Sequence, residues 1–477
     1  MTRSTRTDID DLKRHFAACG QAHVLSFWER LDDAGRERLQ AQASRLAPQL
    51  EEFMAAERAA TSASGKSDQQ RIEPPEAIAL PAHGGDPARV EAARLRGDAL
   101  LRQGKLAAFV VAGGQGTRLG FDGPKGCFPI GPVTDRTLFE IQAQKIRGLA
   151  RRVGRRVPWY VMTSDATDAL TREVFEREDY FGIDSDDVRI FQQGMVPAFS
   201  FEGRMILERP DRIFESPNGH GGSLTALESS GSLDDMERRG IDTIFFYQVD
   251  NPLVKMADPV YLGFHAEARA EMSCKVVRKR DPAEKVGVVA RVEGRVAVVE
   301  YTELQDEQRF ARDPKGELVF WAGSVAIHLL STEFVRRVAA DAAALLPFHV
   351  SAKKIPGLDS EGRPVSPSEP NGRKLERFVF DALPAARRTC VVETSAAEEF
   401  APVKNARGGD SPESSRRALT AQYRRWLEAA DYELPPEGRA IEIDHSEIDS
   451  PEEAVAAGYR SLSEARDLIR VTAGTNS

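Results

Sequence analysis

The most informative stretch of the chain is LAAFVVAGGQGTRLGFDGPKG, residues 106–126. Its short apolar run, LAAFVV, predicts a buried parallel strand that ends at a cluster of glycines. Glycine has no Cβ, so backbone N–H groups in such a loop can approach the oxygens of a phosphate. Arg118 and Lys125 add positive charge to the loop and favour a polyphosphate ligand. A simple turn that carries solvated cations is the alternative interpretation.

Two familiar phosphate-binding loops do not fit this stretch. A Walker loop requires Gly-Lys-Ser/Thr after its spacer, but Arg118 and Leu119 occupy the corresponding positions after Gly113. The dinucleotide fingerprint G-x-G-x-x-G has Leu119 where it requires its third glycine. The loop therefore predicts a phosphate site of another kind, at the carboxyl end of a strand.

Strands and helices alternate on the carboxyl side of the loop. Helical periodicity covers 137–154, 168–178 and 232–240, and strand-like apolar runs cover 157–164 and 241–251. This alternation indicates an α/β domain with a largely parallel sheet. The stretch 287–303, GVVARVEGRVAVVEYTE, alternates valines around Glu293-Gly294 and predicts an antiparallel hairpin, inserted in the sheet or at its edge.

The two ends of the chain differ from this central region. Apolar residues recur at helical spacing between Leu12 and Leu50, and 87–104 predicts a helix with proline at its start and glycine at its end. The stretch between these helices, about 60–87, is rich in Ser, Gly and Pro and predicts a surface loop. We therefore expect a helical N-terminal region (1–104), a central α/β domain (105–385) and a small C-terminal domain (386–477).

Composition restricts the classes of function. The 477 residues include 65 Lys+Arg and 74 Asp+Glu, which gives a net charge of −9, and no basic block is present to bind a nucleic acid. With 41% hydrophobic and 29% charged residues, the chain is typical of globular proteins. The four cysteines contain no Cys-x-x-Cys pair, which argues against a zinc ribbon and a disulfide scaffold. No secretory signal and no apolar run near the ~18 residues that span a bilayer are present, so we expect a soluble cytoplasmic protein with no membrane partner.

Motifs along almost the whole chain are similar to those of a known family. AGGQGTRLG (112–120) is followed by FQQGMVPAFS, PNGHGG, YQVDNPLVKMADP, VGVVARV, VVEY, SAKKIP, PNGRKLERFVFD and FAPVKNA, in that order. In these motifs the chain resembles the UTP–sugar-1-phosphate uridylyltransferases, and among them the UDP-N-acetylglucosamine pyrophosphorylase branch. The resemblance implies a Rossmann-like fold of the nucleotide-diphospho-sugar transferase type. In that fold a central mixed, mostly parallel sheet is flanked by helices, and 105–385 would form the catalytic domain.

The resemblance also implies a reaction, the Mg²⁺-assisted in-line attack of a sugar 1-phosphate on the α-phosphorus of UTP with release of pyrophosphate. The matching positions make Arg118, Lys125 and Lys404 the expected catalytic cations. Asp250 is the expected ligand of Mg²⁺, for which Mn²⁺ is the substitute. The residue types suit these roles, because arginine offers phosphate a planar fork, lysine a point charge, and a carboxylate at a strand end can hold Mg²⁺. The alternatives are solvated surface cations and an aspartate that caps a turn.

Further positions match the family's nucleotide and sugar contacts. The expected nucleotide-binding residues are Ala112, Gly113, Gly114, Gly116, Gln193 and Gly221, and the amide of Gln193 would complement uracil. The expected sugar-binding residues are His220, Gly287, Glu300, Ser324, Phe378 and Phe380. Ser324 and His220 depart from the branch, which has asparagine at both positions. A histidine at position 220 is more typical of UDP-glucose and UDP-sugar pyrophosphorylases.

The leading hypothesis is a uridylyltransferase that acts on N-acetylglucosamine 1-phosphate as a monomer or a weak dimer. A UDP-glucose or broad-specificity UDP-sugar pyrophosphorylase is the alternative within the same class. A nucleotide-sugar sensor without catalysis is a third hypothesis, although the four expected catalytic and metal-binding residues are all retained. A glycosyltransferase usually carries Asp-x-Asp after a strand, whereas this strand ends in Val249-Asp250-Asn251.

Overall fold

The computed structural model describes residues 8–62, 71–458, 461 and 464–472. The chain divides into two compact units. Unit 1 comprises Met1–Gln70, Gly194–Ser223 and Asp341–Asp381, and unit 2 comprises Arg71–Gln193, Leu224–Ala340 and Ala382–Ser477. Each unit joins segments from more than one of the three ranges expected from the sequence, and that three-part division stays a prediction.

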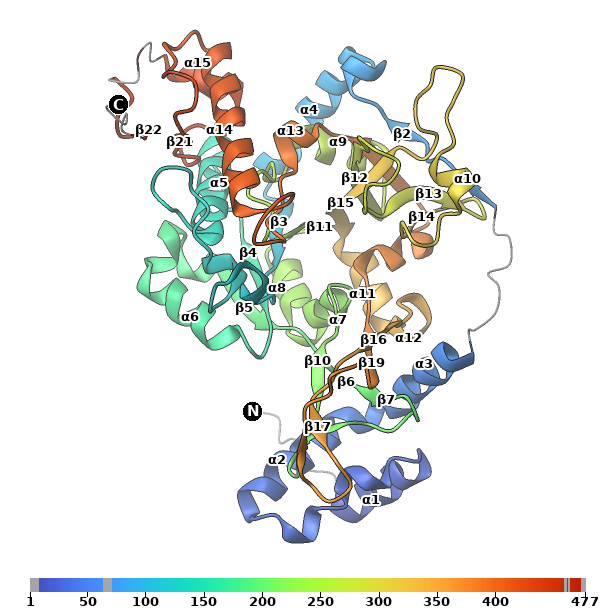
Figure 1. Ribbon diagram of the computed structural model, residues 1–477. Coiled ribbons are helices and arrows are strands. Elements are labelled where there is room, and N and C mark those ends of the chain that lie inside the picture. Colours follow the sequence, from blue (N-terminus) through green and yellow to red (C-terminus); the bar gives the residue numbers. More distant parts are fainter. Residues whose placement is uncertain (1–7, 63–70, 459–460, 462–463, 473–477) are drawn as a thin grey trace. The chain divides into compact units, whose positions relative to one another are not determined.

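The centre of unit 2 is a mixed, mostly parallel sheet (Figure 1). Its main path runs through β2 (Ala77–Ile78), β20 (Thr389–Glu393), β12 (Met272–Arg278), β15 (Ala322–Ser331), β11 (Thr243–Gln248), β3 (Leu106–Val111), β4 (Trp159–Thr163) and β5 (Val188–Gln192). Neighbouring strands on this path are parallel, except that β15 runs antiparallel to β12 and β11. The expected fold class is confirmed, and β3 is the buried strand predicted before the glycine loop.

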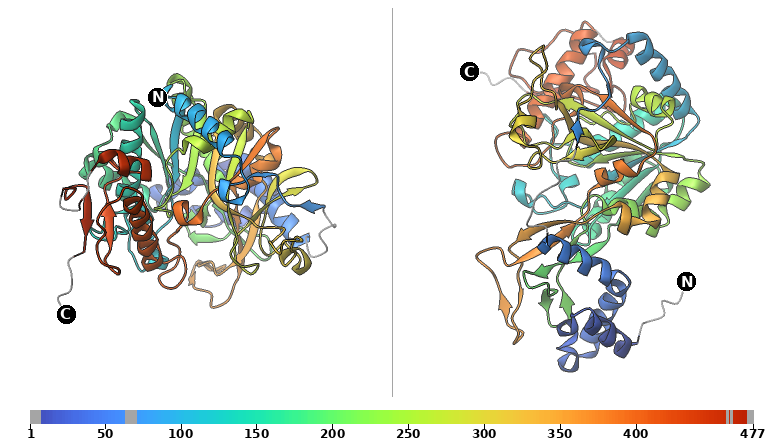
Figure 2. Two further views of the ribbon diagram at one scale, coloured as in Figure 1. Left: turned by 90° about the horizontal axis from the view of Figure 1, so that it is seen from above. Right: turned by 90° about the vertical axis from the view of Figure 1, so that its right-hand side faces the viewer.

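Helices pack on the sheet. Successive residues of a strand face opposite sides, so every second residue of β3 points to the same face. Leu106, Ala108 and Val110 of β3 share one apolar cluster with residues of α4 (Pro87–Arg102), α5 (Leu138–Val153), α9 (Pro259–Glu267) and α14 (Pro412–Ala429). Two further views show helices packed along the strands (Figure 2). The remaining helices described in unit 2 include α6 (Asp168–Arg177), α8 (Ser232–Arg238), α10 (Asp306–Arg309), α11 (Thr332–Ala340), α13 (Ala396–Glu399) and α15 (Pro451–Ala457).

Local sequence explains where α4 and α5 begin and where α5 ends. The side chain of Asp86 accepts the N–H of Ala88 at the start of α4, and the side chain of Thr137 accepts the N–H of Glu140 at the start of α5. Gly154, at a φ of 65°, ends α5 in the left-handed conformation that glycine tolerates. The helices predicted over 87–104 and 137–154 are confirmed.

β13 (Val288–Val292) and β14 (Arg295–Val299) form the predicted antiparallel hairpin, with Glu293 and Gly294 at positive φ in its turn. The prediction of a loop over about 60–87 is wrong in part. β1 (Ile72–Glu73) pairs with β13 and β2 pairs with β20, so this stretch contributes two short strands. Their partners lie far away in the sequence, and local composition did not reveal them. Residues 63–70 of that stretch lie outside the described residues.

Unit 1 has an apolar core of its own. Phe16, Phe53, Phe199 and Leu375 belong to this core. Its helices are α1 (Ile9–Ala18), α2 (Asp33–Leu46), α3 (Leu50–Ser62) and α12 (Ala342–Leu345), and its main sheet joins β16 (His349–Lys353), β19 (Gly372–Glu376) and β7 (Phe199–Ser200). Shorter pairs are β6 (Met195–Pro197) with β10 (Glu215–Pro217), β8 (Leu207–Arg209) with β9 (Arg212–Ile213), and β17 (Gly357–Leu358) with β18 (Pro364–Val365). The N-terminal helical periodicity is thereby confirmed.

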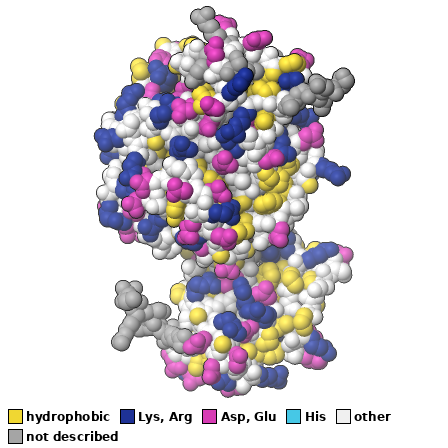
Figure 3. Space-filling model, turned by 90° about the vertical axis from the view of Figure 1, so that its left-hand side faces the viewer, with side chains coloured by type: hydrophobic (Ala, Val, Ile, Leu, Met, Phe, Trp, Pro, Cys, Tyr) yellow, Lys and Arg dark blue, Asp and Glu magenta, His cyan; other side chains and the backbone are white. Residues whose placement is uncertain are grey.

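The C-terminal residues of unit 2 pack onto its main core. β21 (Ile441–Ile443) pairs with β22 (Ile469–Val471), and the isoleucines of both strands join the apolar cluster that contains α5. Figure 3 shows cationic and anionic side chains interspersed over one face of the molecule. Within the described ranges, no helix is long and apolar enough to cross a membrane.

Candidate active site

The glycine loop follows β3 and folds back on itself. The N–H of Gly116 donates to the carbonyl of Gly123 at 2.9 Å, and the N–H of Lys125 donates to the carbonyl of Gly114 at 2.9 Å. Gly126 packs so tightly on α5 that a Cβ there would lie 2.1 Å from the ring of Phe139. Only glycine permits this approach. The loop is therefore tied both to itself and to α5, which fixes the backbone at Lys125.

Lys125 and Asp250 face each other from the loops that follow two neighbouring strands. Asp250 follows β11, which runs parallel to β3 and beside it. The Lys125 ammonium lies 3.5 Å from the Asp250 carboxylate, and the two side chains are 19% and 16% exposed. Ligands of open α/β sheets bind at this carboxyl edge. The structure thus brings the two groups together where the sequence placed a phosphate site. Burial raises the pKa of the neighbouring Cys127 thiol to about 11, so this cysteine stays protonated.

Lys404 reaches the same region through its backbone. The N–H of Val403 donates to the carbonyl of Asp250 at 2.9 Å, which places Lys404 one residue from the Asp250 strand end. The Lys404 side chain is exposed, and its ammonium lies 5.8 Å from the centre of the Phe400 ring. Arg118 lies in the short 3-10 turn Thr117–Leu119 of the glycine loop and is exposed.

The predicted base-reading residue, Gln193, lies against the first glycine of the loop. Gln193 is 8% exposed, and its N–H donates to the carbonyl of Thr163 at 2.9 Å. A Cβ on Gly113 would lie only 2.4 Å from Nε2 of Gln193. The hydroxyl of Ser164 donates to the carbonyl of Gly113 at 2.8 Å and supports the loop from behind. Ala112, the residue between β3 and Gly113, is buried.

Three of the predicted sugar-binding residues come together in unit 2. The N–H of Ser324 donates to the carbonyl of Gly287 at 2.8 Å. A Cβ on Gly287 would lie 3.4 Å from Oε1 of Glu300. Gly287 and Glu300 flank the hairpin β13–β14, and Ser324 belongs to β15, so three elements of the sheet supply this group.

The other predicted contacts come together in unit 1. The rings of His220 and Phe378 stack with centres 5.1 Å apart, and the rings of Phe378 and Phe380 are also 5.1 Å apart. The N–H of Val379 donates to Nδ1 of His220 at 3.1 Å. Gly221 donates its N–H to the carbonyl of Arg377 at 2.8 Å, and a Cβ there would meet the backbone of 377–378 at 2.6 Å. A substitution at this glycine would therefore disturb the segment that carries the aromatic rings.

Two polar side chains that bind the backbone around Asp250 were not predicted from the sequence. Gln142 and Lys145 of α5 are buried and donate to carbonyl groups of residues 249–254. A signal was present, because both lie on the face of the helix that also carries Leu138, Ile141 and Leu149. Polar residues inside an apolar stripe need buried partners.

The donor set at Asp250 suits Mg²⁺. Among the described residues, no group of three or more His, Cys, Asp or Glu side chains could hold a metal ion by itself. Mg²⁺ commonly takes one or two protein carboxylates and completes its shell with substrate phosphates and water. A single accessible carboxylate beside the glycine loop fits that pattern.

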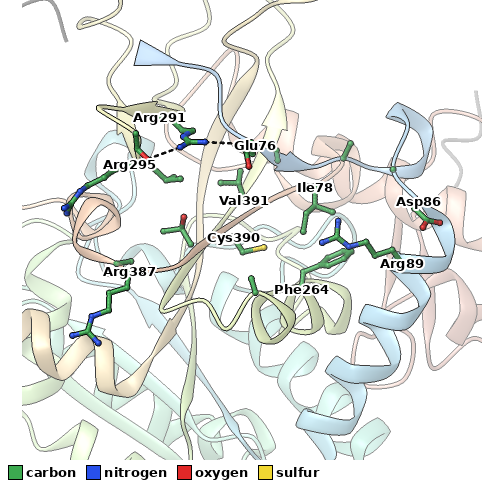
Figure 4. Close-up of a pocket in the computed structure, with 18 of the residues that line it drawn as sticks. Glu76, Ile78, Asp86, Arg89, Phe264, Arg291, Arg295, Arg387, Cys390 and Val391 are labelled. Atoms are coloured by element: carbon green, nitrogen blue, oxygen red, sulfur yellow. Dashed lines mark hydrogen bonds and ion pairs between the residues drawn. The ribbon is translucent and has the colours of Figure 1, made fainter. Parts of the chain in front are cut away.

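A separate cavity of about 870 Å³ lies elsewhere in unit 2 (Figure 4). Its lining includes Ile78, Arg89, Phe264, Arg291 and Cys390, and none of the predicted site residues lines it. Arg291 pairs with Glu76 at 2.9 Å, and Arg89 pairs with Glu267 at 2.9 Å. The charges of these two arginines are thus already balanced by carboxylates.

Comparisons with known proteins show the family of the chain. The family model described as UTP–glucose-1-phosphate uridylyltransferase matches residues 51–424. The chain is 40% identical over 462 residues to UDP-N-acetylhexosamine pyrophosphorylase-like protein 1 of Xenopus tropicalis, covering 94% of this chain and 90% of the relative. It is 35% identical over 438 residues to UDP-N-acetylglucosamine pyrophosphorylase of Saccharomyces cerevisiae, covering 88% and 92%.

Solved structures give the same relationship. The crystal structure of the uridine diphosphate N-acetylglucosamine pyrophosphorylase from Trypanosoma brucei in complex with inhibitor is similar, with a TM-score of 0.80 and 31% identity, covering 90% of this chain and 87% of that chain. A crystal structure from Entamoeba histolytica has a TM-score of 0.74 and 30% identity, covering 82% of this chain and 98% of that chain. The chain therefore belongs to the UTP–glucose-1-phosphate uridylyltransferase family, whose members are nucleotidyltransferases.

Proposed function

We propose that the chain transfers a uridylyl group from UTP to a sugar 1-phosphate. The observation that carries this function is the Lys125–Asp250 pair, 3.5 Å apart, formed by the loops that follow two neighbouring parallel strands. A phosphate oxygen of the sugar 1-phosphate attacks the α-phosphorus of UTP and forms a new P–O bond. The bond between the α-phosphorus and the oxygen that bridges to the β-phosphate breaks, and pyrophosphate leaves with the electron pair. The attacking phosphate is already anionic and needs no general base.

Catalysis in this reaction is positioning and charge stabilisation. The Lys125 ammonium neutralises charge that develops on the α-phosphoryl oxygens. Arg118, exposed on the same loop, suits the leaving pyrophosphate because its planar fork can contact two oxygens. Lys404 would contact the phosphates from the segment whose Val403 N–H binds the Asp250 carbonyl. Asp250 would hold Mg²⁺ together with phosphate oxygens, and the bound ion would add positive charge near the triphosphate.

The contact between Gly113 and Gln193 supports selection of uracil. A side-chain amide offers a donor and an acceptor together, which uracil complements with its carbonyl groups and N–H. Because Gln193 is buried and its amide packs on the loop, its orientation is restricted before the nucleotide binds. Preorganised polar groups of this kind discriminate strongly against the wrong base.

N-acetylglucosamine 1-phosphate is the proposed sugar substrate. The relatives of Saccharomyces cerevisiae and Trypanosoma brucei are named for that sugar, and this chain is similar to both over most of its length. A second candidate, glucose 1-phosphate or a broader range of sugars, is favoured by Ser324 and His220. His220 stacks on Phe378, so a titratable imidazole replaces a neutral amide beside the aromatic group.

The proposal also covers the metal cofactor, the compartment and the oligomeric state. Mg²⁺ serves as the cofactor, and Mn²⁺ can replace it. We expect the chain to act in the cytoplasm as a monomer or a weak dimer. The four cysteines, all free thiols, suit a reducing compartment.

Purified protein assayed with UTP and a panel of sugar 1-phosphates tests the proposal. We expect pyrophosphate release that depends on Mg²⁺, is abolished by a chelator, and is fastest with N-acetylglucosamine 1-phosphate. Asp250→Asn should release pyrophosphate far more slowly and should bind Mg²⁺ in the presence of UTP more weakly. Faster turnover of glucose 1-phosphate would select the second candidate. No pyrophosphate from any sugar would refute both.

A further inference from the structure

Lys145 is a buried cation that the proposed reaction does not use. It lies on α5 and is 2% exposed. Its ammonium donates to the carbonyl oxygens of Pro252 and Val254, at 2.8 Å each. Burial lowers the pKa of this lysine, and the more distant carboxylates of Asp449 and Glu399 raise it. Burying an ammonium group among carbonyls is costly compared with an apolar side chain, so its presence calls for a specific role.

The two carbonyls belong to the loop that begins with the proposed metal ligand. β11 ends at Gln248, and the carbonyls that Lys145 binds lie two and four residues after Asp250. One turn earlier on α5, Gln142 donates its amide to the carbonyl of Val249 at 2.9 Å. The two side chains of α5 therefore hold the residue directly before Asp250 and the second and fourth residues after it.

A second set of bonds ties this loop to residues 399 and 401. The amide of Asn251, 3% exposed, donates to the carbonyl of Glu399 at 2.7 Å and accepts the N–H of Ala401 at 3.1 Å. The Glu399 carboxylate is itself bound by the buried ammonium of Lys275. Asp250 thus projects from a loop whose backbone is fixed on both sides, while its own carboxylate faces Lys125.

The C-terminal segment packs against α5. Gly148 approaches the backbone so closely that a Cβ there would lie 2.3 Å from the carbonyl oxygen of His445. Arg151 donates to the carbonyl of Ser446 at 3.0 Å, and the backbone N–H of His445 lies 3.4 Å from the Gln144 oxygen that accepts it. These contacts involve residues beyond the 51–424 matched by the family model. They fix the helix that carries Lys145.

We propose that Lys145 is a positioning residue for uridylyl transfer, which sets the place of the Asp250 carboxylate through the Pro252 and Val254 carbonyls without touching substrate. This role rests on the proposed function, since Asp250 must act in the reaction for its position to matter. Sugar-contacting groups on β15 and beside the β13–β14 hairpin lie on other elements and keep their places when Lys145 is changed. Metal binding and turnover are therefore affected, and affinity for the sugar is not.

The test compares three variants of the full chain with the wild type. Lys145→Met keeps the length of the side chain and removes the donors, and Gln142→Leu removes the neighbouring bond to Val249. Leu149→Ala is the matched control, because Leu149 is fully buried on the same helix and contributes only apolar packing. Calorimetric titration of Mg²⁺ into protein with UTP, steady-state kinetics and the thermal midpoint are measured for each.

We expect Lys145→Met to weaken Mg²⁺ binding about tenfold, as loss of a group that orients a metal ligand commonly does. Its kcat falls by a similar factor, and its KM for the sugar phosphate stays within about twofold of the wild type. Gln142→Leu shifts Mg²⁺ binding in the same direction and keeps the proposal testable if Lys145→Met does not fold. Leu149→Ala lowers the thermal midpoint but leaves Mg²⁺ binding unchanged.

Two results would overturn the positioning role. One is unchanged Mg²⁺ affinity and kcat in folded Lys145→Met, or in Gln142→Leu where Lys145→Met does not fold. The other is an equal loss in Leu149→Ala, which would mean that general destabilisation of α5 causes the effect. A wild-type protein that transfers no uridylyl group would instead refute the proposed function, and this role with it.

Discussion

Replacing Gly113 with alanine should damage nucleotide recognition while leaving the fold intact. Gly113 does not adopt a positive φ, so alanine is compatible with the backbone. The added Cβ would lie 2.4 Å from Nε2 of Gln193, and its next contacts, with Ser164 Cβ and Gln193 Cδ, are at 3.3 and 3.4 Å. The amide of Gln193 is the end of a flexible side chain, so it moves while the backbone stays.

The size of the effect follows from the displaced amide. Contacts between heavy atoms are favourable near ~3.5 Å, so the amide must retreat by about 1 Å, which is enough to break a hydrogen bond to the base. Losing that bond and leaving a polar partner unsatisfied costs about 1–3 kcal/mol. The expected loss in kcat/KM for UTP is therefore about 5- to 150-fold.

Steady-state kinetics with UTP and CTP, at saturating sugar 1-phosphate, measure this loss and the change in base selectivity. Gln193→Ala should produce a similar loss, and the double variant should lose little more than either single variant, because the added methyl acts through Gln193. Gly194→Ala is the matched control, since a Cβ there meets nothing within 4 Å. Normal kcat/KM in Gly113→Ala, or losses that simply add in the double variant, would show that the contact does not orient a base-reading amide.

Three further changes test other parts of the account. Lys125→Ala should lower kcat by ~10²-fold or more with little change in thermal midpoint, because it removes one preorganised charge near the reacting phosphate. Ser324→Asn should raise the ratio of kcat/KM for N-acetylglucosamine 1-phosphate to that for glucose 1-phosphate, because it restores an amide at the sugar side. Glu271→Gln tests a structural pair by urea unfolding between pH 2 and 8, because hydrogen bonds from Arg337 at 2.8 and 2.9 Å lower the pKa of Glu271 to about 2.

The sign of the pH effect follows from that lowered pKa. The unfolded glutamate has a pKa of about 4.3, so the pair stabilises the fold fully above that pH and loses its effect as pH falls toward 2. The difference in unfolding free energy between the wild type and Glu271→Gln should therefore be constant near neutral pH and shrink in acid. A difference that grows in acid would contradict this reasoning.

Near-normal turnover in Lys125→Ala would remove that lysine from the mechanism, and an unchanged sugar ratio in Ser324→Asn would remove Ser324 from sugar selection.

Elements with strong local patterns could be predicted from the sequence. The apolar run 106–111 ended at glycines, the helix over 138–153 had caps at both ends, and valines alternated on each side of Glu293-Gly294. β1 and β2 were missed because each has only two residues and is defined by pairing with distant strands. Unit 1 could not be derived from local pattern either, since its sheet pairs β7 near residue 200 with β19 near residue 372.

The candidate site shows the same division between local and long-range information. Lys125 could be inferred from its loop, because glycines and a cation in one short stretch already indicate phosphate. Lys404 has no local signal, and its place depends on the bond from the Val403 N–H to the Asp250 carbonyl. The contact between Gln193 and Gly113 likewise has no local signal, because the two residues come together only in the folded chain.

Isotope tracing of the phosphates of UTP separates uridylyl transfer from other uses of a nucleotide. Wild-type protein is incubated with N-acetylglucosamine 1-phosphate, Mg²⁺ and UTP labelled either at the α- or at the γ-phosphorus. In-line transfer at the Lys125–Asp250 site predicts that the α-label enters the UDP-sugar and that the γ-label leaves in pyrophosphate. Recovery of the γ-label as inorganic phosphate, or of the α-label only in unreacted UTP, would contradict it.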